Sequence, residues 1–381
     1  MTIRLYNQDS ELLAFSAVVT GCEEKKGQYA VTLDRTAFFP EGGGQGADHG
    51  VLGGVHVLDV HEVSGEVVHT TDAPLCVGTQ VEGQVDVVRR LDMMQQHSGE
   101  HIFSGLVCSL FGYDNVGFHI GSEAVTMDFN GPMTEEDIRR VERLANEIVW
   151  KNVPVETLLP GKEELEAMHY RSKKALEGEV RIVRIPGADI CACCGTHVKY
   201  TGSVGQIKVM GFMKYKSGVR VSILCGRRAL EEETALLDQV KGSSNLLSCK
   251  QGEVMQSVER LLGERDQLRY TSEQLGLRIF DMMAEKEQNN AVRVVVCDAI
   301  AAGAVRKAAG KLCAGARMGL VLVPREEGYS FALSSETEDV RPATKALCSA
   351  FGGKGGGPKD MTQGLLGPAS VEAIREKMNT L

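Results

Sequence analysis

Two clusters of metal-binding residue types, some 90 residues apart in the sequence, constrain this chain most. The first is His97-Ser-Gly-Glu-His101, and the second is Cys191-Ala-Cys193-Cys194-Gly-Thr-His197. If residues 93–110 form a helix, the spacing of four stacks both imidazoles of the first cluster on one face. Three imidazoles and one thiolate are a donor set that suits zinc, which binds N and S ligands tetrahedrally. Together the clusters predict a metal site.

Each cluster alone has a simpler interpretation. Two histidines four residues apart are often only a surface pair on a helix, and a Cys-x-Cys-Cys run can be a redox thiol cluster. The first cluster also differs from the H-E-x-x-H motif of zinc peptidases, because Glu100 precedes the second histidine and does not follow the first. A zinc peptidase is therefore a poor fit.

Composition narrows the class of protein. The net charge of −9 is not the basic footprint of a nucleic-acid binder, but local basic patches would be hidden in such a sum. The first ten residues lack the apolar core of a signal peptide, and no apolar run reaches membrane-spanning length. We therefore expect a cytoplasmic protein whose 11 cysteines are reduced, where clustered cysteines bind metal more often than they form disulfides.

Changes of periodicity along the 381 residues predict a multidomain α+β protein of four segments. Residues 1–88 alternate in the manner of strands and predict a small β-barrel, with strands at 13–19, 29–33, 55–60 and 81–87. Residues 89–228 mix helices and strands and carry both clusters. Helices are expected from residue 93, at 134–149 and at 162–176. Strands are expected at 124–129, 180–185, 206–210 and 219–224.

A glycine-rich loop interrupts the first segment between Thr36 and Asp48. Three successive glycines, which include Gly43 and Gly44, follow Pro-Glu and cannot be a strand interior. They suit a loop whose backbone N–H groups approach a ligand, although a flexible hairpin tip is the alternative. Thr36 and Gln45 would supply side-chain hydrogen bonds to a polar substrate.

Residues 229–290 predict one or two long helices. In 4-3 steps from Val254 to Met282, seven of nine positions are apolar, which indicates a short coiled-coil seam. This seam either pairs two subunits or packs on its own chain. Residues 242–245, Gly-Ser-Ser-Asn, predict a break before it.

Residues 291–381 predict a small α/β domain with strands at 292–297, 319–324 and 329–333. The glycine-rich stretch Gly352–Asp360 follows a helix and contains Lys354 and Lys359. It predicts a backbone nest for an anion or an RNA phosphate, with a plain flexible loop as the alternative. A second basic group lies between residues 199 and 228, where a solvated sheet edge is as good an explanation as a phosphate track.

The sequence resembles the alanyl-tRNA editing proteins of the AlaX group, long form, and the editing and C-terminal domains of alanyl-tRNA synthetase. The resemblance lies in motifs that follow one another in order, and it extends over nearly the whole chain. The motifs are Phe38-Phe-Pro-Glu-Gly-Gly-Gly-Gln45 with Asp48, Val85-Asp86, Arg89-Arg90, Met94-Gln-Gln-His97-Ser-Gly-Glu-His101, Cys193-Cys-Gly-Thr-His197-Val, Arg220, Cys225-Gly-Arg-Arg-Ala229 and the glycine-rich stretch at 352–360.

The resemblance implies a zinc-containing editing domain at 89–228, a helical linker at 229–290 that could form a homodimer, and a DHH-associated-like domain at 291–381 that binds tRNA. It implies one zinc ion per chain, held by His97, His101, Cys193 and His197. Cys193 is preferred because it precedes His197 by four residues, whereas Cys191 and Cys194 are competing thiols.

The implied activity is hydrolysis of tRNA(Ala) wrongly charged with serine, or with glycine, by an aminoacyl-tRNA deacylase acting in trans. Such a second site is needed because an alanine pocket cannot strongly reject an analogue that adds one hydroxyl. The candidates for substrate binding or catalysis are Thr36, Gln45, Gly43, Gly44, Asp48 and Glu100. Glu100 is expected to lie at the surface or behind the metal ligands. The candidates for binding the tRNA acceptor end are Lys199, Lys214, Lys216, Arg220, Arg227, Lys354 and Lys359.

Three alternatives stay open at this point. Zinc either activates a water or positions the substrate, and a complete set of four ligands favours positioning. The chain could instead be a zinc-stabilised RNA-binding module without turnover. It could also hydrolyse small amino-acid esters without RNA, although the long C-terminal extension counts against this.

Overall fold

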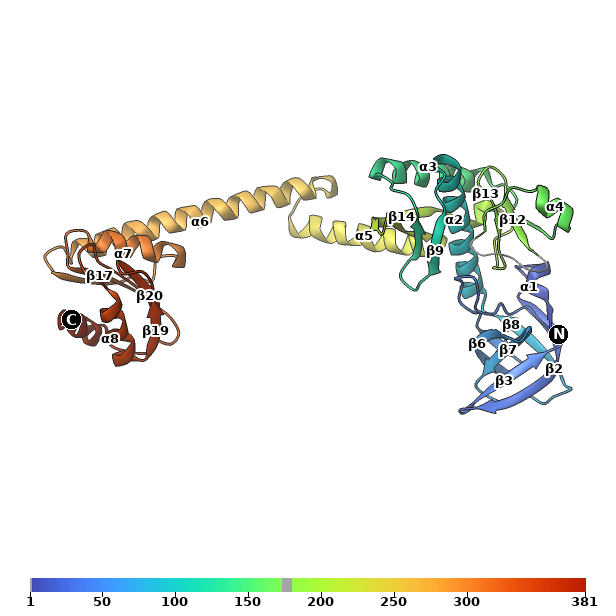
Figure 1. Ribbon diagram of the computed structural model, residues 1–381, viewed down its shortest axis with the longest axis horizontal. Helices are drawn as coiled ribbons and strands as arrows, with labels where there is room; N and C mark the ends of the chain where they lie inside the picture. Colours follow the sequence, from blue (N-terminus) through green and yellow to red (C-terminus); the bar gives the residue numbers. More distant parts are fainter. Residues whose placement is uncertain (1, 173–179) are drawn as a thin grey trace. The chain divides into compact units, whose positions relative to one another are not determined.

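The computed structural model describes residues 2–172 and 180–381 (Figure 1). The chain separates into two compact units, Met1–Gln239 and Val240–Leu381. Helices and several sheets make up the chain, which confirms the predicted multidomain α+β class. The finer division into four segments stays a prediction. In the part of the chain that the structure describes, no helix is both long and apolar enough to cross a membrane.

Six strands of the first unit pair in the order β2-β3-β7-β6-β5-β8, and β8 pairs back with β2, so the sheet closes on itself. The strands are β2 (Ala14–Lys25), β3 (Gln28–Leu33), β5 (Gly50–Leu52), β6 (Val55–Val63), β7 (Glu66–Thr71) and β8 (Gln80–Val85). Buried and exposed side chains alternate along β8, so Val81 and Val85 join an interior cluster with Phe15 and Phe38. Three short elements precede or interrupt this sheet: β1 (Ile3–Arg4), α1 (Leu5–Gln8) and β4 (Arg35–Thr36).

Helix α2 (Val87–Phe111) follows β8 directly and is buried along most of its length (Figure 1). The strand predicted at 81–87 is therefore too long at its end. The Asp86 side chain accepts hydrogen bonds from the backbone N–H groups of Val88 and Arg89, which caps the helix and stops the strand. Gly112 ends α2 in the left-handed conformation, with φ of 70°.

A four-stranded sheet packs against α2 in the order β14-β15-β10-β9. Its strands are β9 (Asn115–Ile120), β10 (Val125–Phe129), β14 (Ile207–Tyr215) and β15 (Gly218–Cys225). Helix α3 (Glu135–Lys151) packs on α2 and begins at a capping box of Thr134 and Asp137, which confirms the helix predicted there. A smaller sheet of β11 (Glu156–Leu158), β12 (Ile182–Ile185) and β13 (Asp189–Ala192) precedes the short helix η1 (Thr201–Val204).

The helix predicted at 162–176 is wrong beyond its first turns. Helix α4 (Lys162–Ala167) ends early, and residues 173–176 of the prediction lie outside the described residues. Arg171 forms a parallel bridge with Cys191: its N–H donates to the Ile190 carbonyl at 2.8 Å, and its carbonyl accepts from Ala192 at 2.9 Å. Pairing with β13 therefore replaces the helical hydrogen bonds.

Helix α5 (Gly226–Leu246) runs through residues 242–245, so the predicted break comes later than expected. The short helix η2 (Gln251–Glu253) then leads into α6 (Val254–Glu285). Several seam residues of α6 are exposed, among them Leu268 at 69% and Leu275 at 50%. That this seam forms a coiled coil between two subunits stays a prediction.

The rest of the second unit is a five-stranded sheet in the order β16-β17-β18-β20-β19. Its strands are β16 (Val292–Val296), β17 (Met318–Pro324), β18 (Tyr329–Ser334), β19 (Gly353–Gly356) and β20 (Met361–Leu366). Its helices are η3 (Ala302–Ala304), α7 (Val305–Cys313), α8 (Arg341–Phe351) and α9 (Val371–Asn379). The loop prediction for 352–360 is wrong at 353–356, where four residues pair with β20 as an edge strand. Glycine permits this because the backbone of β20 leaves no room for side chains: a Cβ at Gly353 would lie 2.1 Å from the Leu365 carbonyl oxygen.

The close packing of α2 predicts that even a methyl side chain at Gly99 destabilises the fold. A Cβ there would lie 2.2 Å from the Cys225 Sγ, whereas a Cβ at Gly263 in α6 meets nothing within 4 Å. Crowding a packed core costs about 1–3 kcal/mol, which exceeds the roughly 1 kcal/mol that alanine gains over glycine in a helix. We expect Gly99→Ala to lower the free energy of unfolding and Gly263→Ala to leave it unchanged or raise it, as measured by urea unfolding. Equal effects of the two substitutions would contradict this packing.

Candidate metal centre

His97 and His101 lie one turn apart on α2, and each is only 2% exposed. Their ring centroids are 5.2 Å apart, which the spacing of four on one helix predicts. Burial excludes the simpler interpretation that they are a surface pair.

The turn after β13 brings the second cluster to these histidines. The Cys193 Sγ lies 3.4 Å from the Nε2 atoms of both His97 and His197. The His197 ring lies 4.5 Å from that of His97 and 4.6 Å from that of His101, between centroids. One ligand atom from each of His97, His101, Cys193 and His197 lies within 4.8 Å of the others. The two clusters thus form a single buried group of four side chains, which we call the four-residue centre.

The outer nitrogen of His97 has a defined hydrogen-bond partner. Its Nδ1 lies 2.8 Å from the Gln45 Oε1, and that oxygen also accepts from the Thr196 backbone N–H at 3.2 Å. Because a backbone N–H can only donate, it identifies this Gln45 atom as the carbonyl oxygen. The proton of His97 therefore resides on Nδ1, and the lone pair of Nε2 faces the centre.

The other two imidazoles have outer partners of different chemistry. The His101 Nδ1 lies 2.8 Å from the Asp189 Oδ2, and the His197 Nδ1 lies 3.2 Å from the Ser98 Oγ. Metal-binding histidines commonly use one nitrogen for the ion and the other for such a partner. The donor set and its surroundings therefore fit a zinc ion bound through three Nε2 atoms and one Sγ.

Charges around Cys193 favour its thiolate. Burial alone would raise the pKa of this thiol, but the His97 and His101 imidazoles hold it well below its ordinary value. Burial lowers the pKa of His197 to about 3, whereas Cys193 and Asp189 overcome burial and raise the pKa of His101 to about 10. The centre thus favours positive charge beside the thiolate, and a divalent cation would supply such charge with release of a proton.

The two competing thiols are in different environments. Burial raises the pKa of Cys191 to about 12 and also raises that of Cys194. Cys191 does lie close to His101 and Asp189 in a second group of possible ligands. Because zinc binds thiolate, these environments favour Cys193 as the sulfur ligand.

The glycine-rich loop lies beside the centre. Gly43 and Gly44 have φ of 60° and 85°, and Gly42 and Gln45 form a bridge that closes the loop. A Cβ on Gly44 would lie 2.6 Å from the Phe118 ring, which stacks on His97 at 5.2 Å between centroids. The loop is therefore clamped, which places Gln45 against His97.

Thr36 and Asp48 support this loop from within. Thr36 is fully buried, and its Oγ1 bonds the His69 Nε2 at 2.8 Å and accepts from the Phe38 N–H at 3.1 Å. Asp48 is fully buried against Arg90 and accepts from the Phe39 N–H at 2.6 Å. Neither side chain hydrogen-bonds the four-residue centre.

Glu100 is fully buried, which excludes the surface position and agrees with the other expected position, behind the metal ligands. Its Oε1 accepts from Ser104 at 2.7 Å and from Asn115 at 2.6 Å, and its Oε2 lies 3.8 Å from the His101 Nε2. The residue is held directly behind the centre because α2 is buried on the side that carries it.

A cavity of about 260 Å³ adjoins the cysteine turn. Its lining joins the glycine loop, through Gly42 and Gly43, to Cys194 and Arg181. Arg181 donates from Nη1 to the carbonyls of Cys193 and Gly195, at 2.8 and 2.9 Å, and has no carboxylate partner among the described residues. No sequence pattern indicated Arg181, because its partners are two backbone oxygens and the Thr157 hydroxyl, which lies 24 residues away in the sequence.

The basic side chains of 199–228 divide into two kinds. Lys199 pairs with Asp9 and Glu11, and Arg220 pairs with Asp128. Lys214, Lys216 and Arg227 are exposed, and none of them is in an ion pair within residues 2–172 and 180–381. Lys354 and Lys359 are likewise exposed on the second unit. The exposed, unpaired lysines and Arg227 are the better candidates for phosphate contacts.

Several known proteins are similar to this chain in sequence. Residues 180–222, which include Cys193 and His197, match a family described as the threonyl and alanyl tRNA synthetase second additional domain. The chain is 29% identical to the alanyl-tRNA editing protein AlaX-L of Pyrococcus horikoshii, over 96% of this chain and 94% of that protein. It is 32% identical to the alanine–tRNA ligase of Ignicoccus hospitalis over 71% of this chain, but it spans only 31% of that enzyme. The alanyl-tRNA editing protein Aarsd1-A of Xenopus laevis is 33% identical over 61% of this chain and 58% of its own length.

The ligand assignment predicts different outcomes for adjacent cysteines. We expect the purified protein to contain one zinc ion. Cys193→Ser should weaken zinc binding by more than about 100-fold, because a loss of up to about 100-fold is typical when only a residue behind the ligands is removed. Cys194→Ser, the matched control, should keep full affinity. Competition with a chromophoric chelator measures both, and the sulfur-to-metal band of the cobalt form reports the thiolate. Loss of that band in Cys194→Ser alone would overturn the assignment.

Proposed function

We propose that this chain, an AlaX-type alanyl-tRNA editing protein related to alanyl-tRNA synthetase, hydrolyses the aminoacyl ester of tRNA(Ala) wrongly charged with serine, or with glycine. The observation that carries the proposal is the meeting of the His97–His101 and Cys193–His197 segments at one buried centre, with the neighbouring Cys194 in the lining of a cavity. The similarity to AlaX-L over nearly the full length of both chains supports the same activity.

The cavity is the proposed place for the aminoacyl ester. Its lining offers the backbone of Gly42 and Gly43, the Thr157 hydroxyl and the Arg181 guanidinium to a polar substrate. Glu41 also lines it and could receive the α-ammonium group of the substrate, whereas the Glu62 carboxylate in the same lining pairs with Arg4 at 2.8 Å. Such groups would hold the ester in one orientation, which is a large part of catalysis by proximity.

A zinc ion in the four-residue centre would supply positive charge next to this cavity. Three imidazoles and one thiolate would fill its four ligand positions, which favours a positioning role over activation of water. Gln45 then acts through His97, whose ring it orients. For Thr36 to read the serine hydroxyl as predicted, its Oγ1 would have to exchange its bond with His69.

A second candidate is a zinc-stabilised RNA-binding module without turnover. The complete ligand set favours it, because structural zinc sites are closed in this way. The cavity beside the centre distinguishes the two functions, since a module that only binds RNA does not require a pocket for the aminoacyl group.

A direct assay of hydrolysis tests the proposal. We expect release of serine from Ser-tRNA(Ala) to be faster than release of alanine from Ala-tRNA(Ala), and to fall by at least about 100-fold in His97→Ala or after zinc chelation. Restoring zinc to the chelated wild type should restore the rate. Bound tRNA with no release of serine at any zinc concentration would favour the binding module.

The C-terminal unit is proposed to bind tRNA through its glycine-rich hairpin. Lys354 lies on edge strand β19 and lines two cavities, of about 470 and 570 Å³. Lys345 and Arg341 line the first of these cavities. This exposed, glycine-rich surface offers backbone groups and unpaired ammonium groups together, which suits phosphate and ribose contacts.

Neutralising the exposed lysines should therefore weaken tRNA binding. We expect the Lys354→Gln/Lys359→Gln variant to lower affinity and to reduce the slope of log K against log salt by roughly one per lost phosphate contact. Lys311→Gln in the same unit is the control, because Asp281 already compensates that charge at 2.7 Å. Fluorescence anisotropy at several salt concentrations measures both quantities. An unchanged slope in the double variant would remove the C-terminal unit as the binding surface.

A further inference from the structure

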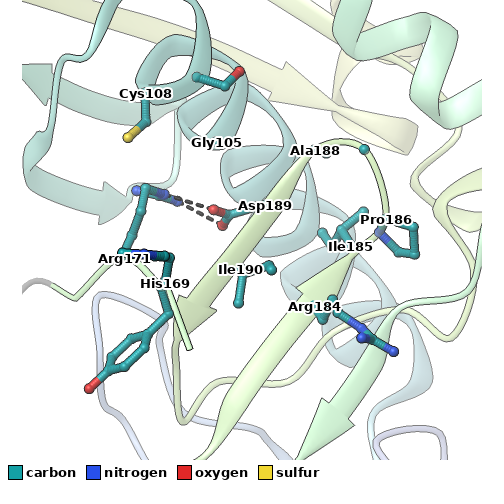
Figure 2. Close-up of a pocket in the computed structure, with 13 residues that line it drawn as sticks. Gly105, Cys108, His169, Arg171, Arg184, Ile185, Pro186, Ala188, Asp189 and Ile190 are labelled. Atoms are coloured by element: carbon teal, nitrogen blue, oxygen red, sulfur yellow. Dashed lines mark hydrogen bonds and ion pairs between the residues drawn. The ribbon is translucent and has the colours of Figure 1, made fainter. Parts of the chain in front are cut away.

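His101 is the one imidazole of the four-residue centre whose outer partner is a carboxylate. Its Nδ1 lies 2.8 Å from the Asp189 Oδ2, and Asp189 in turn binds Arg171. The Arg171 Nε donates to Oδ1 and its Nη2 to Oδ2, both at 2.7 Å, which is the two-point geometry of a strong pair. Figure 2 shows these two side chains directed toward each other in the lining of a cavity.

The pair is built into the strand that leads to Cys193. Asp189 opens β13 and is 6% exposed, while Arg171 is held by its backbone bridge to Cys191. Gly105 of α2 lies against this strand, because a Cβ there would be 2.3 Å from the Ala188 carbonyl oxygen. Helix α2, strand β13 and the Arg171–Asp189 pair therefore share one packed interface. The position of the Asp189 carboxylate against His101 depends on this packing.

We propose that Asp189 and Arg171 are positioning residues for the metal centre: Arg171 fixes the Asp189 carboxylate, which holds the proton of His101 on Nδ1 and turns its Nε2 toward the ion. The proposal rests on the metal centre of the proposed function and not on its hydrolytic activity. As a carboxylate, Asp189 has no proton to donate and can only accept this hydrogen bond. It therefore selects the tautomer of His101 that carries its proton on Nδ1. Arg171 compensates the buried charge that this requires.

A purely structural ion pair is the competing explanation, and the cavity permits a test against it. Arg171 lines a cavity of about 520 Å³ together with Cys108, His169 and Arg184 (Figure 2). Truncation of Arg171 would open a space next to Asp189 that a free guanidinium ion can reach from this cavity. Arg184 lines the same cavity but pairs with Glu156, so it provides a matched control.

The first measurement is zinc affinity by chelator competition, with the absorption spectrum of the cobalt form. Asp189→Asn keeps the shape of the side chain but can turn its amide N–H toward the His101 Nδ1, which puts the imidazole proton on Nε2. We expect an affinity loss of about 10- to 100-fold and a changed cobalt spectrum. Unchanged affinity would overturn the proposal, even if the melting temperature of the metal-free protein fell.

The second measurement is chemical rescue of Arg171→Ala. We expect a smaller loss of zinc affinity than in Asp189→Asn, restored by millimolar guanidinium but not by urea, which has the same shape without the charge. Arg184→Ala should bind zinc normally and respond to neither. A loss that guanidinium does not restore would overturn the role of Arg171. If Arg171→Ala does not fold, Arg171→Lys is used in its place. Full zinc affinity of Arg171→Lys would contradict the proposal that Arg171 must hold Asp189 by two hydrogen bonds.

These readouts need no tRNA. A wild-type protein that binds zinc but releases no serine would contradict the proposed hydrolysis and still test this inference. Wild-type hydrolysis with unchanged zinc affinity in both variants would contradict only the inference.

Discussion

The buried ion pair of Arg90 and Asp48 holds together the parts that build the centre. Arg90 is fully buried and donates to Asp48 and to the carbonyls of Ser10 and Ala37, at 2.7 and 2.6 Å. The pair joins α2 to the glycine loop and to the N-terminal segment. Removing one partner would leave a buried charge uncompensated, which costs about 3–5 kcal/mol. Both joined segments contact the centre. Gln45 of the glycine loop hydrogen-bonds His97, and the Ser10 Oγ of the N-terminal segment donates to the His197 carbonyl at 2.6 Å.

Three unrelated outer partners then orient the three imidazoles. An amide oxygen of the loop, a hydroxyl of α2 and a carboxylate of β13 each contact one Nδ1. Because these groups come from segments far apart in the sequence, the geometry exists only in the folded unit. A metal ion bound there would therefore stabilise the fold of the first unit, in the way ligand binding to a native state does.

The parts of the centre that depend on residues close together in the sequence could be predicted from local sequence patterns. The spacing of four predicted that His97 and His101 share a helix face, and the glycine run predicted a tight loop before Gln45. Asp189 and Arg171 were missed because neither has a spacing rule: one lies 88 residues from His101, and the other reaches it only through a bridge that the helix prediction excluded. Edge strand β19 was missed for a related reason, since glycine carries no alternation and only the backbone of β20 makes it a strand.

The charges around the centre decide what it can bind. Asp189 and Arg171 compensate each other, and the lowered pKa of Cys193 provides a thiolate near the buried Arg181 guanidinium. Glu100 adds a buried carboxylate, whose Oε2 lies 3.8 Å from the His101 Nε2. A divalent cation would add positive charge to this group next to Cys194, which lines the glycine-loop cavity. Negative charge develops on an ester carbonyl oxygen during hydrolysis, and a preorganised positive field in a site that excludes water stabilises it most. Zinc with a complete ligand shell would supply that field without a water of its own, so a closed ligand set is compatible with the proposed hydrolysis.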